Sequence, residues 1–110
     1  MRMLAHPARQ EIELTSIFHA LSDPVRLGIV VGLLDGLEQS TGRLAVPMNK
    51  SSLSHHLKIL REAGITFTRL DGTHRFLSLR REDLDARFPG LLPAIAASAG
   101  RFGLTRLYAA

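Results

Sequence analysis

Apolar residues near the start of the chain recur at the spacing of an amphipathic helix. Within residues 8–21 they fall at i, i+3, i+4 and i+7, at Leu14, Ile17, Phe18 and Leu21. This spacing places all four on one face of a helix. The pattern predicts a first helix between Ala8 and Leu21, with that face toward the core.

A second helix is predicted directly after the first. Ser22-Asp23-Pro24 indicates its start, because Asp is a favourable N-cap and Pro suits the first turn, where its missing N–H would have no partner. The helix is expected to end at Asp35-Gly36. Its inward-facing residues are expected to be Leu27, Val30, Val31 and Leu34.

A short third helix is predicted before the most distinctive stretch of the chain. Ser40 or Thr41 can cap it, and it would continue to about Ala45, where Pro47 ends it.

The stretch KSSLSHHLKILREAG, residues 50–64, predicts a fourth helix with two contrasting faces. Its leucines Leu53, Leu57 and Leu60 lie within about 40° of one another on a helical wheel and define the buried side. The opposite side carries Ser51, His55, Lys58 and Glu62, with Ser52 and Ser54 flanking it near the N-terminus. Gly64 is the expected C-terminal stop. The helix should therefore turn a polar, basic face outward.

Two alternating runs, ITFTRL and THRFLSL, follow on either side of Asp71-Gly72. Strand-like runs joined by Asp-Gly indicate a β-hairpin, because a type I′ turn needs positive φ at both central residues. Arg69 and Arg75 would flank the tip of this hairpin.

The C-terminal part predicts a polar segment and then a helix over about residues 89–99, with Pro93 as a point of disturbance. Its apolar stripe is Leu91, Leu92, Ile95 and Ala99. Residues 101–110 show little periodicity and are expected to form a frayed tail. The predicted fold is mainly α with a β-hairpin wing. Its order of elements is that of a winged helix-turn-helix, in a single domain over residues 1–100.

Composition limits the possible chemistry. A chain of 110 residues fits one domain, and its 45% hydrophobic and 22% charged residues are typical of a folded protein. Cysteine is absent, which excludes disulfides, thiolate nucleophiles and thiolate metal sites. No run approaches the roughly 18 apolar residues of a membrane span, and the first 13 residues lack the apolar centre of a signal peptide. The expected location is the cytoplasm.

The positive charge is concentrated in one segment. The formal net charge is +4, and residues 50–81 contain seven basic residues against only Glu62 and Asp71. Such a cluster favours a polyanionic partner, although a solvated basic face remains the plain alternative.

Catalytic chemistry at residues 50–64 finds little support. Ser51 and His55 lie one helical turn apart, but the only nearby carboxylate on that face is Glu62, two turns further on. A nucleophile pair needs a third group to orient the base and a pocket for substrate. We therefore do not expect an enzyme.

A metal site is also disfavoured. The five histidines are His6, His19, His55, His56 and His74. Adjacent histidines on a helix point about 100° apart, whereas two ligands on one face need a spacing of three or four, and no such pair occurs. His56 is instead expected to be partly buried beside the leucines. An unorthodox histidine site that senses zinc stays open as an alternative.

DNA contact suits the polar helix better. Hydroxyls and backbone N–H groups at a helix start can bind phosphate oxygens, and Lys50 or His55 can reach base edges in a major groove. Arg69, His74 and Arg75 near the hairpin tip would then contact the neighbouring backbone or minor groove.

Three segments, ALSDPVRLGIVVGL, SSLSHHLKILREAGI and RLDGTHRFLSLR, together resemble the ArsR-type winged helix-turn-helix repressors. The resemblance covers about residues 14–80. It implies a homodimer, assembled through the first and last helices, that binds an imperfect inverted repeat near a promoter and blocks transcription. It implies a structural or phosphate-directed role for Arg26, and it assigns DNA contacts to Lys50, Ser51, Ser52, Ser54, His55, Lys58, Arg69, His74 and Arg75.

The departures from that family concern its sensors. The segment GRLAVPM carries no cysteine pair, and no His, Asp, Glu or Cys follows Arg87, so neither familiar metal site can form. Thiol redox sensing is excluded as well. No cofactor is expected, and the effector is a small molecule, a partner protein or absent. The alternative function is a winged-helix protein–protein interaction module, using the apolar C-terminal stripe or an uncovered wing edge.

Overall fold

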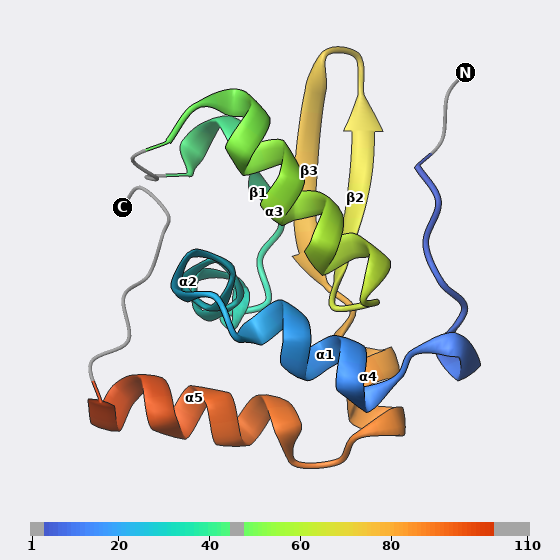
Figure 1. The fold of residues 1–110 in the computed structure, drawn as a ribbon, viewed down its shortest axis with the longest axis vertical. Helices are drawn as coiled ribbons and strands as arrows, with labels where there is room; N and C mark the ends of the chain where they lie inside the picture. The colour runs from blue at the N-terminus through green and yellow to red at the C-terminus, as the bar shows by residue number, and fades with distance from the viewer. Residues whose placement is uncertain (1–3, 45–47, 103–110) are drawn as a thin grey trace.

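The computed structural model describes residues 4–44 and 48–102, and shows a helical body from which a β-hairpin projects (Figure 1). The elements in chain order are η1 (Arg9–Glu11), α1 (Leu14–Leu21), α2 (Pro24–Leu33), β1 (Gln39–Ser40), η2 (Thr41–Arg43), α3 (Lys50–Glu62), β2 (Thr66–Asp71), β3 (His74–Leu79), α4 (Arg81–Arg87) and α5 (Leu91–Phe102).

The first helix is shorter than its apolar pattern predicted, and only part of that pattern faces the core. A 3-10 turn, η1, occupies the segment before it, and Ile12 follows in an extended conformation with 1% of its surface exposed. Ile12 packs so tightly on Gly64 that a Cβ there would lie 2.6 Å from Ile12 Cγ1. Seating Ile12 in this way requires extended backbone, which explains why α1 begins only at Leu14.

The stripe on α1 is divided between core and surface. Ile17 is fully buried, but Leu14 and Phe18 are 42% and 56% exposed. The expectation that all four apolar residues face the core is therefore wrong for these two. The eight-residue helix packs on α2 and α3 along its Ile17–Ala20 side, which leaves the other edge of the stripe uncovered.

The second helix begins where the sequence predicted. The Asp23 carboxylate accepts hydrogen bonds from the backbone N–H of Val25 at 2.8 Å and of Arg26 at 3.1 Å, and Pro24 occupies the first turn. Val30 and Val31 are buried as expected, whereas Leu27 and Leu34 are only half-buried and Ile29 and Leu33 take fully buried positions. Helix α2 contacts α1, α3, α5 and β3. It is therefore buried on more sides than the single apolar face that the sequence predicted.

The helix-turn-helix consists of η2 and α3. The predicted third helix is a single 3-10 turn, and the Ser40 side chain caps it by accepting from Gly42 N–H at 3.3 Å. Ala45 and Pro47, its predicted end, lie outside the described residues. Helix α3 buries Leu57 and Leu60 and half-buries Leu53. It stops before Gly64, whose φ of 86° confirms the predicted glycine terminus.

The wing is an antiparallel sheet with strand order β1-β3-β2. Strands β2 and β3 pair from Thr66 opposite Leu79 to Asp71 opposite His74, so the two loop residues are Gly72 and Thr73. The hairpin is as predicted, but the turn lies one residue later than Asp71-Gly72. Gly72 has φ of 61°, and no other residue type in the described ranges has positive φ. This is the pattern of a type II′ turn, which needs glycine only at its first central position.

Helices α4 and α5, which follow the wing, lie at the end of the molecule opposite the hairpin tip and close the core there (Figure 1). Helix α5 buries Leu92 and half-buries Leu91, Ile95 and Ala99, and it packs on α2 and α4. Pro93 lies in the first turn, where its missing N–H costs no intrahelical bond, so it does not disturb the helix. Residues 103–110 of the predicted tail lie outside the described residues. No single described helix is long and apolar enough to cross a membrane; α1 and α2 pass that test only as a pair, across a 105° bend.

Candidate nucleic-acid interface

One face of α3 is polar and open. Burial of the leucine side against the core leaves six predicted contact residues exposed: Lys50, Ser51, Ser52, Ser54, His55 and Lys58. At the start of the helix, Asn49 Oδ1 accepts from the Ser51 hydroxyl and from the Ser52 N–H, both at 2.9 Å. Asn49 was missed as the N-cap, although an Asn directly before a helical run is a recognised start signal. Its carboxamide occupies the Ser52 N–H, which a phosphate would otherwise bind.

The N-terminal half of α3 and the wing tip share one hollow. It has a volume of about 450 Å³ and brings Lys50 and Ser54 of α3 together with His74 and Arg75 of β3. Ser40, Thr41, Gly42 and Thr73 also line it, and sequence reasoning did not select them because nothing in the linear pattern places them beside α3. Four of the predicted residues therefore meet, whereas Ser51, Ser52, His55 and Lys58 are not among the residues that line this hollow.

Arg69 is held by carboxylates in this structure. Its Nη2 and Nε atoms donate to the two oxygens of Glu38 at 2.7 and 3.0 Å, and its guanidinium lies 4.4 Å from the centre of the Phe76 ring. The hydrogen bond from Arg69 lowers the pKa of Glu38, and the same bond raises the pKa of Arg69. The pair attaches the wing to the loop before β1. Contact between Arg69 and a phosphate would require this guanidinium to exchange partners.

Arg26 joins three helices from within. It is 7% exposed on α2, and its Nε donates to the carbonyl of Ala20 at 2.7 Å while Nη1 lies 3.0 Å from Nδ1 of His56 on α3. Its Nη2 adds a longer bond of 3.4 Å to the carbonyl of His19. Arginine can only donate, so His56 Nδ1 accepts and the imidazole proton lies on Nε2. This geometry makes Arg26 a structural residue that connects the last turn of α1 to α3.

His6 covers part of the free edge of the wing. Its Nε2 accepts from the Thr68 N–H at 3.0 Å, and its ring stacks on Phe67 with 4.5 Å between centroids. Burial, together with the positive charges of Arg61 and Arg80, lowers the pKa of His6. The edge of β2, considered above as open for strand addition, is therefore occupied at Thr68.

The residues considered for other chemistry are not assembled for it. The Ser51 hydroxyl donates to Asn49 rather than to His55. Within residues 4–44 and 48–102 no three His, Asp or Glu side chains are grouped closely enough to hold a metal ion. His56 is half-buried, as the leucine pattern predicted.

A two-helix turn element, an exposed polar helix and an arginine-bearing hairpin define the class of winged helix-turn-helix DNA-binding proteins. Residues 23–65 match the family described as "Bacterial regulatory protein, arsR family". The chain belongs to this family and is a transcriptional regulator. Regulators of the family are DNA-binding proteins without enzymatic activity.

Two Bacillus subtilis proteins are similar in sequence. One, an uncharacterized HTH-type transcriptional regulator, YceK, is 42% identical over 82 residues, 72% of this chain and 82% of its own length. The other, the transcriptional repressor SdpR, is 37% identical over 68 residues, 60% of this chain and 74% of its own length.

Solved structures of the family share the fold. The transcriptional repressor BigR from Xylella fastidiosa superposes with a TM-score of 0.63 and 28% identity, covering 87% of this chain and 97% of the other. An ArsR family transcriptional regulator superposes with a TM-score of 0.59 and 27% identity, covering 84% and 98%.

Proposed function

We propose that the protein is a cytoplasmic, homodimeric repressor that binds an inverted-repeat operator. The observation that carries this proposal is the exposed polar surface of α3, where two lysines, three serines and His55 are open to solvent while Leu57 and Leu60 are buried. Repression is the named activity of SdpR and of BigR, which are similar to this chain.

In this proposal the hollow beside α3 takes up the DNA backbone. Lys50 and Arg75 supply its positive charge, while Ser54 and His74 supply hydrogen-bonding groups. Affinity comes mainly from phosphate neutralisation, and specificity comes from a few contacts at Lys50, Ser51, Ser52, Ser54 and His55 together with DNA shape. Lys58 contacts the backbone outside the hollow, and Arg69 joins the wing contacts after it leaves Glu38.

The dimer is proposed to form through α1 and α5. Leu14 and Phe18 on α1 expose large apolar side chains, and α5 carries no charged residue from Leu91 to Gly100. Both helices lie at the end of the molecule opposite the hairpin tip (Figure 1). A second copy packed there would leave both α3 faces free. Two such helices in successive major grooves place the half-sites about 34 Å, or 10 to 10.5 base pairs, apart.

Gel shifts on random duplex DNA at several salt concentrations test the proposal, followed by sequencing of genomic fragments that the protein selects. A steep salt dependence and recovery of an inverted repeat are expected. Absence of binding even at low ionic strength would refute it. Such a result would favour the interaction module instead.

A further inference from the structure

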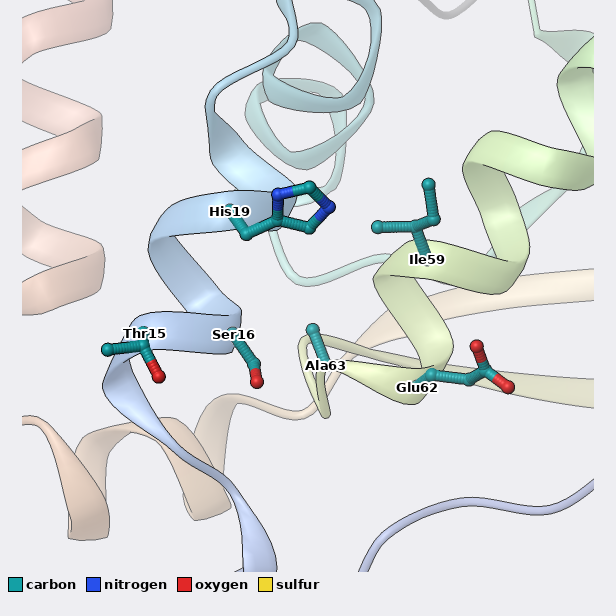
Figure 2. Close-up of a pocket in the computed structure, with 6 residues that line it drawn as sticks. All are labelled: Thr15, Ser16, His19, Ile59, Glu62 and Ala63. Carbon is teal, nitrogen blue, oxygen red and sulfur yellow. The ribbon is translucent and has the colours of Figure 1, made fainter.

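A second pocket lies on the side of α3 that faces α1. Its volume is about 370 Å³, and its lining consists of Thr15, Ser16 and His19 from α1 and Ile59, Glu62 and Ala63 from α3. Figure 2 shows the His19 ring and the Ile59 side chain pointing toward each other across the gap, while the Glu62 carboxylate lies at the rim, turned away from α1. Neither the hollow beside the wing nor the proposed DNA contacts use these residues.

The lining selects a class of ligand. Ile59 and Ala63 give an apolar surface, and the other residues give two hydroxyls, an imidazole and a carboxylate. All of these polar groups can accept hydrogen bonds, and the lining contains no Lys or Arg. Among the lining residues, the only carboxylate or ammonium-type charge that an anion would meet is that of Glu62. A metal ion would find two strong ligands, His19 and Glu62, where zinc sites in proteins use three or four.

We propose that this pocket binds a small organic ammonium ion with a short hydrocarbon body. The body lies between His19 and Ile59, and the ammonium group donates to Glu62, which swings inward from the rim. The volume falls within the range of small-molecule sites. The pocket is then the effector site of the repressor, a role that rests on the proposed function.

The contacts around Arg26 connect the pocket to the DNA-binding face. The carbonyls of His19 and Ala20 both accept from Arg26, at 3.4 and 2.7 Å, and Arg26 also binds His56, the neighbour of His55 on α3. A ligand that shifts the last turn of α1 relative to α3 must disturb these bonds. Because ligand and DNA then favour different arrangements of the same two helices, each changes the affinity of the other by an equal factor.

Binding is tested on the full chain by following the imidazole proton resonances in NMR while n-butylammonium chloride is added at constant ionic strength. His19→Gln identifies the His19 signal among the five histidines. That signal should shift saturably with n-butylammonium, and sodium butyrate should leave it unmoved. Equal responses to both ions, or no response to n-butylammonium, would overturn the proposal.

Two matched variants locate the ammonium group. Glu62→Gln should weaken n-butylammonium binding about tenfold, whereas Glu82→Gln, which neutralises an exposed carboxylate on α4, should leave it unchanged. If both variants bind n-butylammonium equally more weakly, the attraction depends only on net charge, and the assignment of the ammonium group to Glu62 is overturned.

Coupling is tested separately by fluorescence anisotropy of a labelled duplex. Saturating n-butylammonium should change the affinity for DNA about fivefold or more in the native protein, and not in Glu62→Gln. The same change in both proteins would refute the effector role, because it would reflect competition of the cation for DNA. If the native protein binds no duplex even without n-butylammonium, while its His19 signal still shifts with n-butylammonium, the proposed repressor is refuted and the ligand site remains.

Discussion

Nη1 of Arg26 lies 3.0 Å from Nδ1 of His56, across the boundary between α2 and α3. The same guanidinium holds the carbonyl of Ala20 at the end of α1. One buried side chain thus fixes three helices relative to one another. The face of α3 that we assign to DNA depends on this arrangement, although Arg26 itself is turned away from it.

Removing this side chain should destabilise the fold. Arg26→Ala leaves the buried carbonyl of Ala20 and the Nδ1 of His56 without their donor, whereas the carbonyl of His19 keeps the Ser22 hydroxyl as a donor. We expect a loss of about 2–4 kcal/mol in the free energy of unfolding. Urea denaturation measures it. Arg43→Ala, at an exposed position on η2, is the control and should change stability by less than about 0.5 kcal/mol. Equal small effects of the two substitutions would mean that the Arg26 contacts do not stabilise the protein.

The two kinds of DNA contact on α3 should separate by mutation. Lys58→Ala should weaken binding to all sequences alike and reduce the slope of log affinity against log salt by about one. His55→Ala should instead relax the preference at one base position by about 1 to 3 kcal/mol. Anisotropy titrations on a cognate and a scrambled duplex measure both. The assignment of His55 fails if its substitution weakens both duplexes equally.

Glu38 should restrain DNA binding through its pair with Arg69. Glu38→Gln removes the closer of the two carboxylate charges paired with the Arg69 guanidinium, at 2.7 Å, and leaves only Asp71 at 3.8 Å. Arg69 is then more readily available to a phosphate. We expect tighter binding and a salt slope steeper by about one. Asp85→Asn makes the same change in charge on α4, away from the hairpin tip, and should have a much smaller effect. Identical gains in both variants would point to net charge alone.

The stability of the protein should depend on pH through His6. The pKa of His6 is lowered from 6.5 on folding, first by burial and then by Arg61 and Arg80, so below that pH the unfolded chain binds more protons than the folded one. The contribution of neutral His6 is complete above pH 6.5 and is lost as the pH falls through its folded pKa. His6→Gln keeps an acceptor for the Thr68 N–H but does not titrate. Urea denaturation from about pH 5 to 8 should therefore show a shallower acid loss in the variant, and parallel curves would exclude this role.

The proposed dimer should break at Phe18 without unfolding the protomer. Phe18 is 56% exposed, so Phe18→Glu removes nothing from the core but places a charge in the α1–α5 interface. Light scattering should show a dimer for the native protein and a monomer for the variant. Leu37→Glu is the control, since Leu37 is 63% exposed in the loop before β1 and should leave the dimer intact. A native protein that is already monomeric would contradict the dimer.

The linear pattern alone determined the order of the main helices and the hairpin and the two faces of α3, but it did not predict η1, the short strand β1 or the helix α4 in the polar segment after the wing. Asp23 before Pro24, the leucines of residues 53–60, Gly64 and the alternating runs around Gly72 each act over a few residues. The start of α2, the buried side and the end of α3, and the hairpin could therefore be predicted. The exposed serines, lysines and His55 followed directly, because a helix that buries one face must present the other.

Only the tertiary structure decided which charges are free and which apolar residues lie inside. Arg69 meets Glu38 across 31 positions, Arg26 meets His56 across 30, and His6 meets Thr68 across 62. No local rule connects such pairs. The late start of α1 depends in the same way on Ile12 packing against Gly64, a contact between distant segments. Leu14 and Phe18 stay exposed because α1 packs on α2 and α3 along its other side. Local preferences decide what each segment forms, whereas burial and pairing are properties of the assembled fold.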